Sequence, residues 1–493
     1  MLVSDLLNQL KQRRFSVNLW PAQPQLLDVE IGGVCFDSRR VQAGDLFCAI
    51  SGEKHLGADY ILPAIDSGTV LVLVDRLQPQ IEFPQLVVAE GSLNTIAAHC
   101  ADIVYEQPSK KMYCAAITGT NGKTTIAHLM RGAFSQMGQN SASCGTLGLI
   151  DSNGIKPNIN TTPSSDITQQ WMASLVADDC SSVVVEASSH GIVQQRLAAI
   201  EFDCVGFSNL SHDHLDYHGT LEKYAQAKSQ LILDLPENSI AFVPHDEMLL
   251  GLSASAKAKV FSWSSRDTAA SYYCCISNAD ELLRIEFDWR GVNCVIESEL
   301  CGYHNGENLF LAALMMLAKG EQPLAVCTAL SQQLPADGRL QQVPVHCGRA
   351  FVDYAHTPDA IEKALNALRS SYPTAFIKAV FGAGGDRDVS KRAAMGAVVS
   401  SNADWCVLTS DNPRTESAQD IIDDVKKGVD AMSVEFHCIA ERGAAINYAI
   451  QSLTPKDVLV VLGKGHENYQ EINGVRHQFD DRLQIIEAVQ CLA

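Results

Sequence analysis

The residues best suited by type and spacing to do chemistry form a glycine-rich segment, GTNGKTT, at 119–125. It lies between a continuous apolar run and a stretch with helical spacing, which is the order of a phosphate-binding loop. Backbone N–H groups of such a loop surround phosphate oxygens, Lys123 adds a positive charge, and the Thr124 hydroxyl suits Mg²⁺. The loop is two residues tighter at its start than the usual nucleotide loop, because Ile117 stands five positions before Gly122. The predicted phosphate-binding residues are Gly119, Thr120, Asn121, Gly122, Lys123, Thr124 and Thr125.

Polar residues also follow the next two apolar runs. Glu186 ends the run SVVVE, where a carboxylate is placed to hold a Mg²⁺ ion that bridges phosphates, although a solvated acid at a strand end has the same pattern. Ser188, Gln194 and Arg196 come soon afterwards and are donors suited to an anionic substrate. The second run leads to 212–218, HDHLDYH, whose three histidines and two aspartates predict either a metal site or a general acid–base centre.

Four apolar runs in the second half of the chain lead directly into polar or glycine-rich loops. These candidate strands, at 350–354, 376–381, 405–409 and 458–462, are followed by YAHTPD, GAGGDRD, SDNPRTE and GKGHENYQ. In open α/β sheets, ligands bind beyond the carboxyl ends of the strands. The four loops therefore predict one shared site.

The elements that must position these residues indicate an α/β protein. Strand, glycine-rich turn and helix alternate from residue 112 and again from about 336, which is typical of parallel α/β domains. The first ninety residues hold short β-like runs, and 255–300 alternates as antiparallel strands do. A length of 493 residues suits about three domains, for which we predict 1–90, 91–335 and 336–493.

Composition narrows the class of protein. The chain has 37 Lys and Arg against 57 Asp and Glu, a net charge of −20, which argues against a protein that coats nucleic acid or anionic lipid. No apolar run approaches the 18 residues that span a bilayer, and the N-terminus lacks the order of a secretory signal. The sixteen cysteines are scattered without metal-ligand spacing, so we predict reduced, mostly buried thiols in a cytoplasmic protein.

Seven motifs in a fixed order carry a resemblance. ITGTNGKTT, VEASSHGIVQQR, NLSHDHLDYHG, YAHTPD, FGAGGDRD, SDNPRTE and GKGHE resemble those of the Mur ligases of peptidoglycan precursor synthesis, and the likeness extends from 37–39 to 480–482. It implies a small N-terminal α/β domain that holds a uridine nucleotide, a central P-loop-type domain that binds ATP, and a C-terminal Rossmann-like domain that brings the amino acid. The implied reaction joins meso-2,6-diaminopimelate to the D-glutamyl γ-carboxylate of UDP-N-acetylmuramoyl-L-alanyl-D-glutamate through an acyl phosphate, with ATP and Mg²⁺.

The resemblance also assigns residues to each substrate. Beside the loop 119–125, it implies ATP contacts at Asn305 and Arg339, although His304, Gly306, Leu340 and Gln341 depart from the commoner residues around them. It implies that the chemistry and the metal involve Lys123, Thr124, Glu186, His214 and Lys228. The implied contacts to the UDP-muramoyl dipeptide are Phe36, Ser38, Glu53, Lys54, His55, Asn160, Thr161, Thr162, Ser188, Gln194 and Arg196.

Lys228 falls where this family carries a carbamylated lysine, N6-carboxylysine. A free ammonium beside Mg²⁺ would be repelled, whereas addition of CO₂ converts the lysine into a carboxylate-like group. Without the resemblance, the same residue would be interpreted as a solvated lysine on an amphipathic helix.

For diaminopimelate, the resemblance implies contacts with Arg387, Asp411, Asn412, Pro413, Arg414, Gly463 and Glu467. Diaminopimelate differs from lysine by a second carboxylate, which a guanidinium binds through two parallel hydrogen bonds. Arg414 is therefore the predicted selectivity residue.

Three alternatives remain. A lysine-adding Mur ligase would not need Arg414, and a folylpolyglutamate synthase-like ligase would not need the N-terminal segment at 37–39. A nucleotide-binding regulator or simple NTPase would leave the four C-terminal loops without a purpose. We expect a monomer whose partners are small molecules, with no nucleic acid and no insertion into a membrane.

Overall fold

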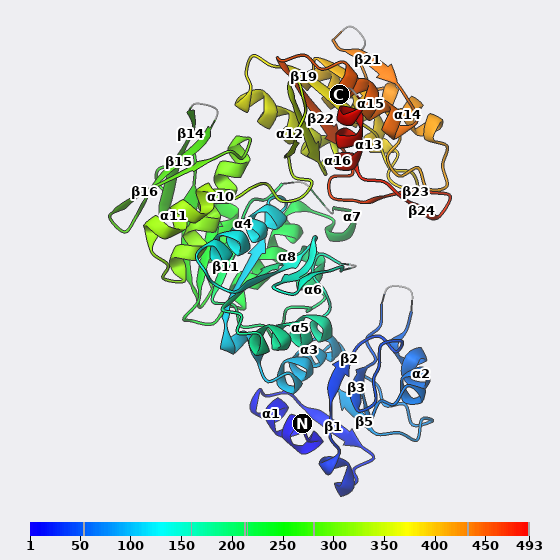
Figure 1. The fold of residues 1–493 in the computed structure, drawn as a ribbon. Helices are drawn as coiled ribbons and strands as arrows, with labels where there is room; N and C mark the ends of the chain where they lie inside the picture. The colour runs from blue at the N-terminus through cyan, green and yellow to red at the C-terminus, as the bar shows by residue number, and fades with distance from the viewer. Residues whose placement is uncertain are drawn as a thin grey trace. The chain divides into compact units, whose positions relative to one another are not determined.

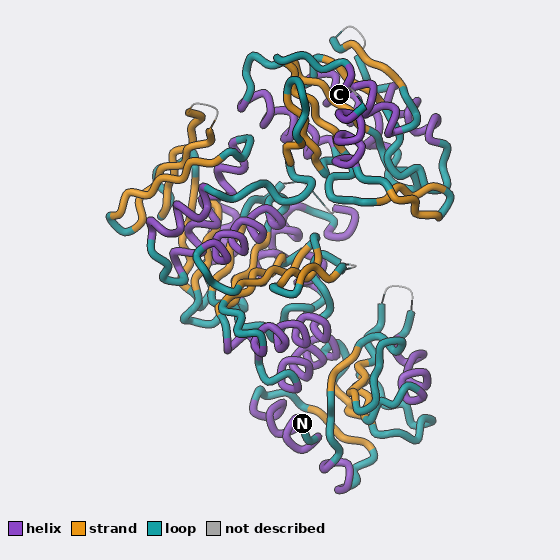
Figure 2. The backbone as a smooth tube through the Cα atoms, in the orientation of Figure 1, coloured by secondary structure: helices purple, strands orange, loops and turns teal. Residues whose placement is uncertain are grey.

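The computed structural model describes residues 1–52, 55–158, 160–211, 213, 215–279, 282–430 and 433–491 (Figure 1). The chain forms two compact units, 1–273 with 311–329 and 274–310 with 330–493. The three junctions fall inside the strand β14 (Tyr272–Ala279) and the helices α10 (Tyr303–Ala318) and α11 (Pro323–Ser331). Both units combine strands and helices (Figure 2), so the predicted α/β class is confirmed.

The N-terminal part of the first unit is a five-stranded sheet in the order β1-β5-β4-β3-β2, parallel except where β1 pairs with β5. Helix α1 buries Val3, Leu6 and Leu10, whose spacing forms one apolar face against the sheet. The elements are α1 (Val3–Gln12), β1 (Val17–Trp20), η1 (Pro24–Asp28), β2 (Gly33–Cys35), β3 (Asp45–Cys48), η2 (Gly57–Tyr60), α2 (Ile61–Asp66), β4 (Leu71–Val74), β5 (Gln85–Val88), α3 (Leu93–Val104) and η3 (Pro108–Lys111).

The rest of the first unit is built on a sheet in the order β13-β12-β11-β6-β10-β7-β8-β9, which is parallel from β13 to β7. Strand β6 is central and almost wholly buried, which explains its continuous apolar sequence. The strands are β6 (Tyr113–Thr118), β7 (Ser141–Gly145), β8 (Gly148–Asp151), β9 (Gly154–Lys156), β10 (Ser182–Glu186), β11 (Cys204–Phe207), β12 (Ile240–Pro244) and β13 (Lys259–Ser264). The helices are α4 (Lys123–Gln136), α5 (Ser165–Ala177), α6 (Ser189–Val193), α7 (Leu215–His218), α8 (Leu221–Leu233) and α9 (Glu247–Ser253).

Register brings the polar ends of three of these strands together. Glu186 at the end of β10 pairs with Ile117 of β6, and Phe207 at the end of β11 pairs with Thr118. The loops that follow β6, β10 and β11 therefore leave the sheet side by side, as the parallel arrangement requires.

The second unit begins with an antiparallel ladder, in which β14 pairs with β15 (Leu282–Trp289) and β15 with β16 (Val292–Ser298). The antiparallel prediction for 255–300 is correct for this ladder and wrong for β13, which pairs in parallel with β12. Helices α10 and α11 (Pro323–Ser331) follow in the chain.

The C-terminal sheet has the order β17-β18-β22-β19-β20-β21 and is parallel except at β17. One hydrophobic core includes residues of α12, α13 and α14, and a second includes residues of α15 and α16. The four strands predicted before polar loops are β18, β22, β19 and β20, and they are neighbours. The elements are β17 (Gln341–Val343), β18 (Arg349–Asp353), α12 (Pro358–Ser371), β19 (Phe376–Phe381), α13 (Ser390–Asn402), β20 (Trp405–Leu408), α14 (Ala418–Lys426), β21 (Glu435–Cys438), α15 (Arg442–Gln451), β22 (Asp457–Leu462), β23 (Tyr469–Ile472), β24 (Val475–Gln478) and α16 (Asp481–Gln490).

The prediction of mostly buried thiols is confirmed. All sixteen cysteines are free thiols, and most are buried. Among the described residues, no helix combines the length and the apolar character needed to cross a membrane.

A fully buried ion pair holds the site end of the C-terminal sheet. The Arg442 guanidinium donates to both carboxylate oxygens of Asp481 at 2.7 Å, and neither side chain is exposed. It also donates to the carbonyls of Ser410 and Leu462 at 3.2 and 2.9 Å, just beyond β20 and at the end of β22. Arg442 thus joins two strand ends to α16.

Replacing Arg442 with alanine leaves the Asp481 carboxylate buried and unpaired, so we expect a loss of about 3–5 kcal/mol from the free energy of unfolding of this unit. The control is Lys363→Ala, which removes the exposed i,i+4 ion pair with Asp359 and should cost at most about 0.5 kcal/mol. Urea unfolding compares the two variants. Equal shifts in the unfolding midpoint would contradict the role given to Arg442.

Candidate active site

The loop between β6 and α4 is a tight glycine turn that leads into a helix N-terminus. Gly119 and Gly122 have φ angles of +135° and +87°, which glycine adopts without strain. The loop is held by the segment after β11, because Thr120 N donates to Asn209 O at 2.8 Å and Asn121 N donates to Asn209 Oδ1 at 3.0 Å. Helix α4 begins at Lys123, so its first N–H groups and its dipole favour an anion at the loop.

Two lysines share one carbonyl of this loop. Lys123 Nζ donates to Gly119 O and Thr120 O, each at 2.8 Å, and Lys228 Nζ donates to the same Gly119 O at 2.8 Å. Lys228 is only 1% exposed and lies over the Tyr224 ring, so its interpretation as a solvated lysine is wrong. Burial, aided by the nearby charge of Lys123, holds the pKa of Lys228 well below its usual range.

Glu186 is buried beside the loop, and its interpretation as a solvated acid is also wrong. Its Oε2 accepts from Thr124 Oγ1 at 2.9 Å and from Thr146 Oγ1 at 3.2 Å, and its Oε1 accepts from Thr146 N at 3.0 Å. A Cβ at Gly145 would lie 1.9 Å from Oε1, so only glycine fits there. A carboxylate and a hydroxyl side by side at a phosphate loop form an oxygen donor set that fits Mg²⁺.

The histidine-rich segment is only partly described. His212 and His214 lie outside the described residues, so the predicted role of His214 stays a prediction. Among the residues that are described, no group of three or more His, Cys, Asp or Glu is arranged to hold a metal.

Residues predicted to bind the peptidyl substrate meet next to Glu186. Thr162 is fully buried, and its hydroxyl donates to Glu186 O at 2.7 Å and accepts from Ser188 N at 2.9 Å. Arg196 donates to Thr162 O and to Gln194 Oε1, each at 2.6 Å. Ser188 caps α6, Thr161 Oγ1 lies 3.2 Å from Thr146 Oγ1, and Asn160 accepts from Asn158 through its carbonyl oxygen.

The predicted nucleotide contacts in the N-terminal sheet lie after β2. Phe36 N donates to Asp166 Oδ2 at 3.3 Å, and Ser38 is buried. Asp166 is 2% exposed, its pKa is raised by burial, and Arg40 approaches it at 3.6 Å. This tie between α5 and the segment after β2 has no signal in the sequence. Glu53 and Lys54 lie outside the described residues, and the His55 ring contacts Tyr60 edge-on.

In the second unit, the loop 411–414 is bonded to the segment after β22. Asn412 donates to Glu467 Oε2 at 2.9 Å, and its Oδ1 accepts from Lys464 Nζ at 3.1 Å. Lys464 is fully buried and also lies 3.2 Å from Glu467. A Cβ at Gly463 would lie 2.3 Å from Asp411 Oδ2. Lys464 is a structural residue that the sequence analysis missed, although it stands inside the GKGHE motif.

Arg414 adopts a left-handed backbone conformation, with φ of +53°, and its side chain turns toward the loop after β19. Its Nη1 donates to Gly385 O at 2.7 Å, and its Nε lies 3.7 Å from Glu471 Oε2. Gly385 also lies against Pro413 O, and a Cβ at Gly384 would lie 3.1 Å from Arg414 Nη1 and 3.8 Å from Cγ of the exposed Arg387. The structure thus brings the two predicted arginines to one glycine turn.

The other predicted ATP contacts, Asn305 and Arg339, belong to the second unit. Asn305 is buried and donates to Cys301 O at 2.8 Å. The Arg339 guanidinium lies over the Tyr354 ring, and its buried Nε has no hydrogen-bond partner in the described part of the chain.

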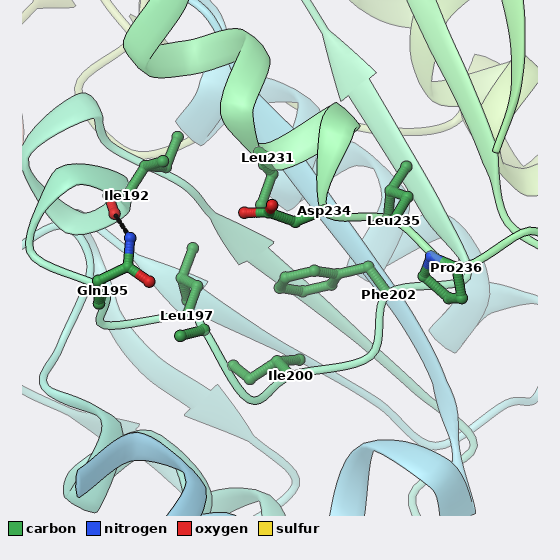
Figure 3. Close-up of a pocket in the computed structure, with 10 residues that line it drawn as sticks. Ile192, Gln195, Leu197, Ile200, Phe202, Leu231, Asp234, Leu235 and Pro236 are labelled. Atoms are coloured by element: carbon green, nitrogen blue, oxygen red, sulfur yellow. Dashed lines mark hydrogen bonds between the residues drawn. The ribbon is translucent and has the colours of Figure 1, made fainter. Parts of the chain in front are cut away.

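A separate cavity of about 50 Å³ lies near α6 and the end of α8 (Figure 3). It is lined mainly by apolar side chains, among them Ile192, Ile200, Phe202 and Leu231, while Gln195 donates to Ile192 O at 3.4 Å. None of the predicted site residues lines it, so we interpret it as a packing void.

Three sequence profiles match successive parts of the chain: the catalytic domain of the Mur ligase family at 30–104, the Mur ligase middle domain at 117–316 and the Mur ligase glutamate ligase domain at 338–465. The UDP-N-acetylmuramoyl-L-alanyl-D-glutamate--2,6-diaminopimelate ligase of Bacteroides fragilis is 35% identical over 462 residues, covering 92% of this chain and 94% of that protein. The enzyme of that name from Chromobacterium violaceum is 36% identical over 489 residues, covering 96% and 97%.

Solved structures of two enzymes have a similar fold. A UDP-N-acetylmuramoyl-L-alanyl-D-glutamate--2,6-diaminopimelate ligase superposes with a TM-score of 0.70 at 33% identity, covering 96% of each chain. A folylpolyglutamate synthase from Thermotoga maritima superposes with a TM-score of 0.60 at 14% identity and covers 75% of this chain and 89% of that one, which shows a shared fold alone.

A Cβ at Gly119 would lie 2.0 Å from Ser208 Oγ, whose hydrogen bond to Asn121 O holds the loop. We therefore expect Gly119→Ala to lower the affinity for Mg·ATP at least about tenfold, measured by calorimetric titration. The control is Gly138→Ala, which also has a positive φ but meets nothing within 4 Å. It should lose some stability and keep its affinity. Equal affinities for the two variants would contradict this account of the loop.

Proposed function

The chain belongs to the Mur ligase family, and we propose that it adds meso-2,6-diaminopimelate to the D-glutamyl γ-carboxylate of UDP-N-acetylmuramoyl-L-alanyl-D-glutamate in peptidoglycan precursor synthesis. The observation that carries the acceptor assignment is the Arg414 guanidinium, which lies in the loop beyond β20. Arg414 gives the acceptor's second carboxylate a bidentate partner. Lysine lacks that carboxylate, so the lysine-adding alternative leaves Arg414 without a ligand.

The reaction couples amide formation to ATP hydrolysis to ADP and phosphate. The γ-carboxylate attacks the γ-phosphorus of ATP to form an acyl phosphate, and the acceptor amine then displaces phosphate from the carbonyl carbon. The glycine loop and Lys123 hold the phosphates by backbone donors and charge. Thr124, Glu186 and His214 would hold Mg²⁺, which when bound reduces the repulsion between carboxylate and phosphate.

The substrate carboxylate is anionic and needs donors close to the phosphate loop. Arg196 supplies a half-buried guanidinium whose two nitrogens are already oriented by Thr162 O and Gln194 Oε1. Because Thr162 bonds both to Glu186 O and to Ser188, the donors are tied to the strand that carries the metal-side acid. The remaining proposed contacts to the nucleotide substrate are Phe36, Ser38, Glu53, Lys54, His55, Asn160 and Thr161.

Diaminopimelate carries an ammonium group and a carboxylate at each end. The C-terminal loops supply both acidic and basic side chains to bind these groups. Arg414 and Arg387 suit its carboxylates, and Glu467 and Asp411 suit its ammonium groups. Asn412 bonds to Glu467, Lys464 and the Glu471 amide, so its part is to hold the loop. Pro413 and Gly463 shape the backbone around these groups.

The remaining assignments follow from this chemistry. ATP and a UDP-sugar are cytoplasmic metabolites, so we place the protein in the cytoplasm. Its assigned partners are small molecules, and we keep the expectation of a monomer. We assign the nucleotide sugar to residues 1–90, ATP to residues 91–335, which include Asn305, and the amino acid to residues 336–493. Arg339 is assigned to ATP although it lies in the last of these ranges.

Lys228 is the residue we assign as a carbamate. Its neutral amine attacks CO₂, a C–N bond forms, and one proton is released, so that an uncharged amine becomes an anionic carbamate. The reaction requires the neutral amine, and the burial that lowers the pKa of Lys228 favours that form. An anionic carbamate would suit a bound Mg²⁺ better than an ammonium, which the metal would repel.

We expect phosphate release from ATP to require both the UDP-muramoyl dipeptide and an acceptor, with diaminopimelate favoured over lysine by at least about a hundredfold in kcat/KM. Phosphate release is measured with each substrate omitted in turn and with the two acceptors in competition. Release that depends on neither substrate would identify a simple NTPase, and a preference for lysine would overturn the acceptor assignment.

We expect ¹³C-labelled bicarbonate to give a carbamate signal in the NMR spectrum of the protein, and the signal should disappear as the pH falls and the amine is protonated. Lys228→Ala should abolish the signal, whereas Lys223→Ala, on the exposed side of α8, should keep it. The carbamate would be refuted if the signal remained in Lys228→Ala or if the wild-type protein gave no signal.

A further inference from the structure

The β23–β24 hairpin holds the backbone of Arg414. Arg414 N donates to Glu471 O at 3.0 Å, and Asn473 N donates to Arg414 O at 2.7 Å, which together form a bridge to Ile472. A left-handed conformation is unfavourable for a side chain of this size, so it persists only where neighbouring groups hold it. Both polar backbone groups of Arg414 are held by the hairpin.

The same hairpin bonds to the rest of the loop. Gln470 Nε2 donates to Asp411 O at 2.6 Å, and Glu471 N donates to Asn412 Oδ1 at 2.9 Å. The strand β23 begins two residues after Glu467, the acid proposed for the acceptor's ammonium group. One short hairpin therefore sets where both the acidic and the basic groups of the acceptor site lie.

The guanidinium of Arg414 has one hydrogen-bond acceptor in the protein, one nearby carboxylate and one edge that is open to a ligand. Nη1 is bonded to Gly385 O at 2.7 Å, and Glu471 Oε2 lies 3.7 Å from Nε, too far for a hydrogen bond but within range of a charge interaction. Within the described part of the chain, Nη2 has no hydrogen-bond partner. The side chain is 20% exposed, so a ligand can reach it.

We propose that the β23–β24 hairpin sets the acceptor selectivity of this ligase, with Glu471 as a positioning residue that directs the Nη2 edge of Arg414 to the far carboxylate of diaminopimelate. The inference rests on the proposed function. Glu471 attracts the Nε side of the guanidinium, so a second carboxylate is repelled from that side and is received at the Nη edge. Glu471 itself does not touch the acceptor.

The test is a double-mutant cycle of Glu471→Gln and Arg414→Ala, with diaminopimelate varied at saturating ATP and UDP-muramoyl dipeptide. Glu471→Gln should raise the KM for diaminopimelate about tenfold, with kcat and the KM for ATP unchanged. In the Arg414→Ala background it should have no further effect, because Glu471 acts only through that guanidinium. Glu471→Asp keeps the charge, so its KM for diaminopimelate should stay close to that of the wild type.

The control is Glu362→Gln, which removes the same charge from an exposed position on α12 and should leave every constant unchanged. An unchanged KM in Glu471→Gln, a rise in the KM for ATP as large as that for diaminopimelate, or full additivity in the cycle would each overturn the inference. A wild-type protein that releases phosphate without needing diaminopimelate would instead refute the proposed function itself.

Discussion

Parallel strand pairing is the constraint on which the rest of this structure depends. Neighbouring parallel strands run in one direction, so the residues that follow them must leave the sheet at one edge. In the first unit this places the segments after β6, β10 and β11 side by side, with Glu186 next to Thr124. In the second unit it places the loops after β19, β20 and β22 together, where Arg414 meets Gly385 and Asn412 meets Glu467. Neither set of contacts is local in the chain.

The net charge of −20 has to be reconciled with substrates that carry negative charge. The substrates assigned to this protein are themselves anions, so binding must depend on a few positioned cations and not on a basic surface. At the C-terminal loops, Lys464 and Arg442 are buried, and they are bonded to an amide oxygen and a carboxylate. Because an unpaired charge in such a place is costly, these contacts also define the shape of the loops.

Selectivity and rigidity are linked at Arg414. A guanidinium discriminates between a dicarboxylic acceptor and lysine only if its free edge points consistently toward the ligand. The left-handed backbone, the Gly385 carbonyl and the hairpin restrict the directions in which the side chain can point. The glycines at 384 and 385 leave the room that this arrangement needs.

The α/β class, the strands that precede the polar loops and the chemistry of the phosphate loop could be predicted from the sequence, because apolar runs and glycine spacing are local patterns. The family could also be predicted, since seven ordered motifs occur together. The folded chain was needed to show that Lys228 and Glu186 are buried, that Asp166 accepts from the Phe36 amide, and that Asn412 supports its own loop. The hairpin that holds Arg414 likewise lies 55 or more residues further along the chain. The burial of a side chain and its hydrogen-bond partners depend on strand order and register, which bring together residues far apart in sequence. No local pattern encodes that arrangement.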